Sequence, residues 1–88
     1  MKLKYKFVIN KVAGEIIAVS VGNTEGDFNG YIELNQTGEF IFRKLKQDIT
    51  REQLIADLLA EYPDATRADA EESVDALVEK LESAGLLI

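Results

Sequence analysis

The chain has 88 residues, 47% of them hydrophobic, and a formal net charge of −6. A chain of this length supports one hydrophobic core, so we expect residues 1–88 to form a single domain. Cysteine and histidine are both absent. Thiol nucleophiles, disulfides, imidazole bases and the usual zinc ligands are therefore excluded, which leaves only carboxylates, lysines, tyrosines and hydroxyls for any catalysis. A small enzyme is thus a remote third alternative to the two binding functions given below, and we expect a protein that is not an enzyme and needs no cofactor.

The distribution of charge and hydrophobicity also limits the possible partners. No apolar run reaches the roughly 18–20 residues of a membrane span, and the N-terminal MKLKYKFV lacks the apolar core of a signal peptide. We therefore expect a cytoplasmic protein with no membrane partner. Residues 48–82 carry eleven acids against three basic residues. Because binding to nucleic acid depends on neutralising phosphates, this distribution argues against DNA or RNA as the partner.

The first part of the chain has the two-residue period of β-strands. Residues 5–12 and 15–22 alternate β-branched or aromatic residues with polar ones, and the Ala13-Gly14 pair between them predicts a β-hairpin. The segment NTEGDFNG, residues 23–30, is rich in residues that favour turns and predicts an exposed loop.

A third short strand is predicted at residues 31–34. Its alternation places Ile32 and Leu34 toward the core and Tyr31 and Glu33 on the other face. A meander of three strands leaves the third as an edge, with unfilled backbone donors and acceptors to which an extended peptide could add. On the strand pattern alone, we favour the alternative that the preceding loop or the last helix covers this edge.

Three helices are predicted after the strands, over about 36–46, from Thr50 to near Tyr62, and from Thr66 to Gly85. Leu86, Leu87 and Ile88 are expected to return over the core. The order of three strands and then three helices indicates an α+β fold, a small antiparallel sheet covered by helices. The last two helices also resemble a helix-turn-helix pair, with the sheet as a wing.

Two patterns resemble ligand sites but are better explained as structure. The acids at 69–82 lack the glycine and the alternating oxygen ligands of a calcium loop, and they predict a solvated helix face. The glycines of residues 22–30 are evenly spaced, yet the Lys-Ser/Thr of a phosphate-binding loop is missing. We expect this segment to be a connector.

Several short motifs follow one another in a characteristic order. Residues 32–45 contain I-x-L-N and then T-G-x-x-I-F-x-x-L, residues 50–62 contain T-x-x-x-L-I-x-x-L-L-x-x-Y, and residues 81–87 contain L-x-x-x-G-L-L. In this order the motifs resemble the PqqD family, named after pyrroloquinoline quinone synthesis protein D. The resemblance covers essentially the whole chain.

The resemblance implies a winged-helix-like fold and a function in making ribosomally synthesised, post-translationally modified peptides. Members of the family act as precursor-peptide recognition elements. They bind the leader of a precursor peptide between the third strand and the third helix and present it to a modifying enzyme, often a radical SAM enzyme. The pathway itself stays open, because similar domains accompany modified peptides other than pyrroloquinoline quinone.

Carried onto this chain, the resemblance places the leader peptide between residues 30–34 and the helix at 67–83. The candidate peptide-binding residues are Gly30, Tyr31, Ile32, Glu33, Leu34, Ala70, Ser73, Val74 and Leu77. A proline at Ile32 is expected to abolish binding by removing an edge donor or disrupting the strand.

A DNA-binding winged helix is the alternative function. The helix at 67–83 would then enter the groove of a DNA duplex. In its first turns Arg67 is the only basic residue, opposite three acids, Asp69, Glu71 and Glu72.

Overall fold

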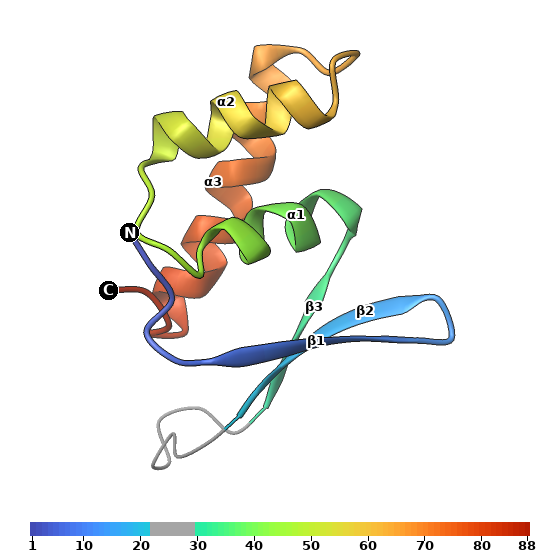
Figure 1. Cartoon of the computed structure of the whole chain (residues 1–88), viewed down its shortest axis with the longest axis vertical. Coiled ribbons are helices and arrows are strands. Elements are labelled where there is room, and N and C mark those ends of the chain that lie inside the picture. The colour runs from blue at the N-terminus through green and yellow to red at the C-terminus, as the bar shows by residue number, and fades with distance from the viewer. Residues whose placement is uncertain (22–29) are drawn as a thin grey trace.

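The computed structural model describes residues 1–21 and 30–88. It contains a three-stranded antiparallel sheet followed by three helices, so the predicted α+β fold is confirmed (Figure 1). The strands are β1 (Phe7–Val12), β2 (Glu15–Ser20) and β3 (Tyr31–Leu34). The helices are α1 (Gln36–Lys44), α2 (Arg51–Glu61) and α3 (Arg67–Ser83). The loop predicted at 23–30 and the glycine connector at 22–30 lie mainly outside the described residues.

The predicted hairpin is confirmed by the pairing of β1 with β2. Val12 pairs with Glu15, which leaves Ala13 and Gly14 as a two-residue turn with φ angles of 51° and 84°. Positive φ at both positions is typical of the tight turn whose twist matches that of the two strands. Both strands are two residues shorter than predicted, because β1 begins at Phe7 and β2 ends at Ser20 rather than at residues 5 and 22.

β3 pairs with β2 on the side opposite β1, so the sheet order is β1-β2-β3. Ile32 and Leu34 are 5% and 8% exposed and face the core, whereas Tyr31 is 60% exposed. The predicted alternation of this strand is therefore confirmed. In the described part of the chain, no other strand pairs with the outer side of β3.

Each helix begins at a capping residue that the sequence predicts. The Asn35 side chain accepts a hydrogen bond from the Gly38 N–H at 2.7 Å, and the Thr50 hydroxyl accepts one from the Gln53 N–H at 3.1 Å. At the start of α3, the Thr66 hydroxyl accepts from the Asp69 N–H at 3.1 Å. These bonds satisfy N–H groups that have no partner inside a helix, and so they fix where each helix starts.

The end of α3 is also fixed by local geometry. Gly85 has a φ of 73°, its N–H donates to the Glu82 carbonyl at 3.0 Å, and the Leu86 N–H donates to the Leu81 carbonyl at 2.9 Å. This pair of bonds is the Schellman motif, which favours glycine at the left-handed position. It turns the chain so that Leu86 enters the core with none of its surface exposed.

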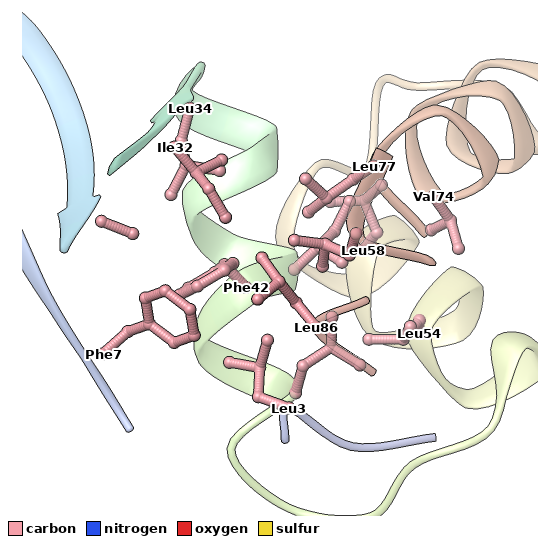
Figure 2. Close-up of a cluster of buried hydrophobic side chains, with 14 of the residues drawn as sticks. Leu3, Phe7, Ile32, Leu34, Phe42, Leu54, Leu58, Val74, Leu77 and Leu86 are labelled. Atoms are coloured by element: carbon pink, nitrogen blue, oxygen red, sulfur yellow. The ribbon is translucent and has the colours of Figure 1, made fainter. Parts of the chain in front are cut away.

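The core lies between the sheet and the helices and joins all six elements (Figure 2). Ile41, Phe42 and Leu45 are completely buried, and Phe7 of β1 meets Phe42 edge to face with ring centroids 5.2 Å apart. A buried aromatic pair of this geometry contributes about 0.5–1.5 kcal/mol beyond its burial. Helix α1 is therefore held directly on the sheet.

The two ends of the chain meet in an arrangement that the sequence predicts only in part. The predicted return to the core is confirmed for Leu86 and Leu87, whereas Ile88 is 75% exposed. The partner of this segment was missed: Leu3 is buried and its N–H donates to the Leu45 carbonyl at 2.9 Å, while the Lys4 N–H donates to the Leu86 carbonyl at 2.8 Å. Leu3 also forms a bridge with Leu87, and Figure 1 shows the two termini close together.

Candidate functional site

The edge strand β3 is the starting point for a candidate site, because its pairing register decides which backbone groups face outward. The Val21 N–H donates to the Lys6 carbonyl at 2.9 Å, one step beyond the last pair of β1 and β2. Bonded and non-bonded pairs alternate along antiparallel strands. The odd-numbered residues of β2 therefore direct their backbone groups toward β1, and the even-numbered residues direct theirs toward β3.

The backbone groups of alternate residues in β3 consequently face away from the sheet. The bonded pairs between β2 and β3 are Ile16 with Leu34 and Ala18 with Ile32. Tyr31 and Glu33 lie between these positions, so their N–H and C=O groups point outward. A side-chain contact agrees with this assignment, since the Glu33 carbonyl accepts a hydrogen bond from Lys80 Nζ of α3 at 3.3 Å.

A groove of about 540 Å³ opens beside this edge. It lies between β3, the start of α1 and α3. From β3 and α1 it is lined by Glu33, Leu34, Asn35, Thr37 and Gly38. From α3 it is lined by Asp69, Glu72, Ser73, Ala76, Leu77 and Lys80. An outward row of backbone groups and a groove with polar and apolar walls thus lie side by side.

Four of the predicted site residues line this groove: Glu33, Leu34, Ser73 and Leu77. Tyr31 and Gly30 are exposed at the start of the same edge, outside the groove lining. Ile32 is buried, and its backbone groups face β2. The edge therefore offers outward backbone groups at Tyr31 and Glu33, but not at Ile32.

The structure places two of the residues predicted for the wall of α3 in the core. Ala70 and Val74 are 1% and 0% exposed, so they belong to the core and do not line the groove. In Figure 2, Val74 is among the buried side chains of the cluster. Two adjacent stripes run along the helix, and the groove stripe lies one residue away from the core stripe.

The two stripes of α3 follow from the 3.6-residue helical period. The core stripe consists of Ala70, Val74, Leu77 and Leu81. The groove stripe consists of Asp69, Glu72, Ser73, Ala76 and Lys80, with Leu77 between the two. Spacings of three and four residues place the members of each stripe on one side of the helix. The same period was available in the sequence, but nothing in the sequence indicates which stripe borders β3.

The groove carries more negative than positive charge. The residues of α3 that line it include two acids, Asp69 and Glu72, and one base, Lys80, whereas the Glu33 side chain projects to the other face of the sheet. Asp69 also accepts a hydrogen bond from the Thr66 N–H at 3.4 Å as part of the capping box. Among residues 1–21 and 30–88, no three acidic side chains lie close enough together to hold a metal ion.

The family model for coenzyme PQQ synthesis protein D (PqqD) matches residues 15–87. The chain belongs to the PqqD family. The match includes β2, β3 and all three helices, and thus the whole of the groove. No curated protein and no solved structure matches the chain, so the winged-helix comparison stays a prediction.

Membership of the PqqD family gives the chain a role in biosynthesis by peptide modification. In PQQ synthesis the family works with a precursor peptide and a modifying enzyme, as an accessory protein that is not itself catalytic. In the part of the chain that the structure describes, none of the helices is long and apolar enough to cross a bilayer.

The PqqD-family motif at residues 34–45 forms the joint between β3 and α1. Asn35 Oδ1 accepts hydrogen bonds from the Gly38 N–H and, at 3.1 Å, from the Thr37 hydroxyl. A Cβ atom at Gly38 would lie only 2.9 Å from Asn35 Oδ1. The close approach of the cap therefore favours glycine at this position, and Asn35, Thr37 and Gly38 line the groove.

Ion pairs join α2 to α3 through acids that do not line the groove. Arg51 donates to both oxygens of Asp75 at 2.7 and 2.9 Å, and Arg67 Nη2 lies 2.7 Å from Glu52. The hydrogen bond from Arg67 to the Glu52 carboxylate raises the pKa of Arg67. Arg67, the base that a DNA-binding winged helix would use at the start of α3, is thus already paired with acids. This pairing adds to the case against DNA as a partner.

Proposed function

We propose that this PqqD-family chain is a non-catalytic adaptor that binds the leader segment of a ribosomally made precursor peptide by strand addition to β3. The adaptor then presents the peptide to a modifying enzyme, with a radical SAM enzyme as the first candidate. The observation that carries the proposal is the outward row of backbone groups at Tyr31 and Glu33, which lies beside the groove of α3.

Backbone hydrogen bonds would supply much of the binding energy. An extended peptide paired with Tyr31 and Glu33 would become a fourth strand, and its affinity would depend little on its side chains at these bonds. Alternate side chains of the guest would point to the same face as Leu34 and enter the groove near Ser73 and Leu77. These positions would select the sequence of the leader.

The charge of the groove favours a particular kind of leader. Two acids of α3, Asp69 and Glu72, and one lysine line it, so a guest with a lysine or arginine among its groove-facing residues would gain electrostatic complementarity. Because a disordered leader loses conformational entropy when it binds, we expect an affinity on the order of micromolar to high nanomolar.

The first experiment is an NMR titration of the ¹⁵N-labelled chain with the short peptides encoded beside its gene. Binding by strand addition would shift the amide signals of β3 and of α3 at the groove stripe, and would protect the amides of Tyr31 and Glu33 from hydrogen exchange. Shifts confined to other surfaces would overturn the proposed groove, and failure of every encoded peptide to bind would count against the adaptor function.

The hydrogen-bond register changes the proline test. At Ile32, proline would remove a donor that faces β2 and so weaken the sheet itself, whereas Glu33→Pro removes an N–H that faces outward. Glu33→Pro should therefore abolish peptide binding while the chain stays folded. Lys11→Pro is the matched control, since the same alternation places its N–H at the outer side of β1. Normal peptide binding by a folded Glu33→Pro variant would rule out strand addition here.

A further inference from the structure

A basic cavity lies at the N-terminal end of the chain. It has a volume of about 360 Å³ and is bordered by residues 2–7 and by Lys46, which follows α1. The N-terminal segment passes the end of α1 there, since the Leu3 N–H donates to the Leu45 carbonyl at 2.9 Å (Figure 1). We call the lysines that line this cavity, Lys2, Lys4, Lys6 and Lys46, the basic cluster.

The basic cluster contains the basic side chains that lack an acidic partner. In residues 1–21 and 30–88, none of its four lysines forms an ion pair or donates a side-chain hydrogen bond. Lys4 Nζ lies 5.7 Å from the centre of the Tyr5 ring, a contact that leaves its charge in place. By contrast, the other six bases of the chain all have oxygen partners: Lys11 and Arg43 bind Glu39, Lys44 binds Asp57, Arg51 binds Asp75, Arg67 binds Glu52, and Lys80 binds the Glu33 carbonyl.

Acidic groups approach the basic cluster at Lys2. The hydrogen bond from the Met1 ammonium group, and more weakly the charge of Lys2, lower the pKa of the Asp48 carboxyl, which Met1 binds at 2.9 Å. The C-terminal carboxylate lies near the same residue, because the Ile88 N–H donates to the Lys2 carbonyl at 2.8 Å. Of the described residues that line the cavity, none is acidic. The lysines beyond Lys2 therefore carry the charge that is open to an outside partner.

Four positive charges around one small cavity repel one another. A volume of 360 Å³ corresponds to about 9 Å across, close to the screening length of about 8–10 Å at ordinary ionic strength, so the repulsion is only partly screened. The remainder of the chain has six bases against sixteen acids, which is a formal charge of −10. An anionic partner is therefore repelled by the rest of the chain and attracted to this end of it, which directs its approach.

The basic cluster is separate from both the family match and the leader-binding groove. The PqqD model matches residues 15–87, so three of the four lysines lie before the match. Among the described residues, the cavity and the groove have no lining residue in common. The N-terminal segment also leads into β1, which is at the opposite edge of the sheet from β3. A partner at the basic cluster would thus leave β3 free for a leader.

We propose that the basic cluster docks a carboxylate-rich segment of the modifying enzyme. The identity of this partner rests on the proposed function, whereas the charge of the site does not. Lysines mounted singly along the N-terminal segment and on the turn after α1 match carboxylates spaced along a peptide chain. A phosphate group fits less well, because its two-point recognition favours arginine, which the cluster lacks. The N–H groups of Leu3 and Lys4 already donate to backbone carbonyls, so they do not bind it either.

An NMR titration of the ¹⁵N-labelled chain with hexaglutamate tests the charge of the partner. Hexaglutamate should shift the amide signals of residues 2–7 and Lys46, with a dissociation constant below about 1 mM at low salt. The affinity should fall about tenfold or more between about 20 and 200 mM salt. A six-nucleotide DNA strand of similar charge and inorganic phosphate should both bind more weakly, and tighter binding of either would overturn the proposal.

Two double variants that lower the net charge equally locate the site. Lys4→Gln/Lys6→Gln removes two charges from the basic cluster and should weaken hexaglutamate binding about fivefold, whereas Lys11→Gln/Lys44→Gln, outside the cluster, should change it less than about twofold. Lys46→Gln leaves the N-terminal segment intact and should weaken binding about twofold. Circular dichroism checks that each variant is folded. Equal binding of hexaglutamate by the two double variants contradicts the proposal.

The modifying enzyme encoded beside the gene tests the partner itself, by biolayer interferometry with the leader present. The enzyme should bind Lys11→Gln/Lys44→Gln as it binds the wild-type chain, and Lys4→Gln/Lys6→Gln about fivefold more weakly. Equal binding of the enzyme by all three proteins rules out this docking. Leader-induced shifts at Tyr31 and Glu33 should be the same in all three. Their absence from the wild-type chain would count against the proposed function, whereas loss of the hexaglutamate preference would count against the basic cluster, so the two failures are distinguishable.

Discussion

Gly38 and Asn35 make the joint between β3 and α1 a sensitive test of the structure. The Asn35 side chain caps α1 through the Gly38 N–H at 2.7 Å, and a Cβ at Gly38 would come within 2.9 Å of the same oxygen. In an ordinary helix, Gly→Ala stabilises by about 0.5–1 kcal/mol. Here the methyl group must displace the cap, and loss of an N-cap costs about 1 kcal/mol, with a range of about 0.5–2.

The two effects predict that Gly38→Ala changes the free energy of unfolding in opposite directions in the wild-type chain and in the Asn35→Ala variant. In the wild-type chain, Gly38→Ala should lower the free energy of unfolding by about 0.5–1 kcal/mol, because the lost cap and the close contact outweigh the helical gain. In the Asn35→Ala variant the obstructing oxygen is gone, so Gly38→Ala should raise the free energy of unfolding by about 0.5–1 kcal/mol. The coupling between the two sites is then about 1–2 kcal/mol.

Urea denaturation followed by circular dichroism measures all four variants, and equal m-values indicate that the comparison is of stability alone. A Gly38→Ala substitution that stabilises the chain equally in both backgrounds would refute the reasoning. It would mean that the cap oxygen does not occupy the space that the glycine leaves open.

Two further predictions concern Lys80 and Glu39. Lys80→Met should raise the affinity for the leader peptide about 2- to 10-fold, because it frees the Glu33 carbonyl and a net hydrogen bond contributes about 0.5–1.5 kcal/mol. Isothermal titration calorimetry measures the affinity, and Lys46→Met, at an exposed lysine, is the control. Weaker binding by Lys80→Met would show that Lys80 holds the guest instead. The hydrogen bond from Arg43, and a further one from Lys11, lower the pKa of the largely buried Glu39 carboxyl below 4.5. The ionised Glu39 carboxylate therefore stabilises the folded chain above pH 4.5, and this stabilisation is lost as the pH falls through the lowered pKa. Glu39→Gln should therefore reduce the acid-induced loss of stability in urea titrations from pH 7 down to about pH 3, and an unchanged pH profile would contradict this account.

The order of the elements was predictable because local signals determine it. Alternation marks the three strands, the Ala13-Gly14 pair marks the hairpin, and each helix starts at a side chain that caps its own N–H groups. Gly85 marks the end of α3 for a similar local reason. The family motif follows the same logic, since Asn35 and Gly38 contact each other across only three residues.

The terminal pairing was not predictable in full, because it joins residues far apart in the sequence. Leu3 looks like one apolar residue among lysines, and its burial depends on backbone bonds to Leu45 and on its bridge with Leu87. Sequence patterns of one strand cannot show such a partner.

The sequence by itself determined that the chain has three strands, three helices and an edge strand at residues 31–34, because periodicity and capping act over a few residues. Only the tertiary structure decided that the backbone groups of Tyr31 and Glu33, rather than those of Ile32, face away from the sheet. It also decided that Asp69, Glu72, Ala76 and Lys80 border the groove, while Ala70 and Val74 lie in the core. The physical reason is that the phase of strand pairing and the rotation of a helix about its axis are fixed by packing between distant segments, which no local pattern encodes.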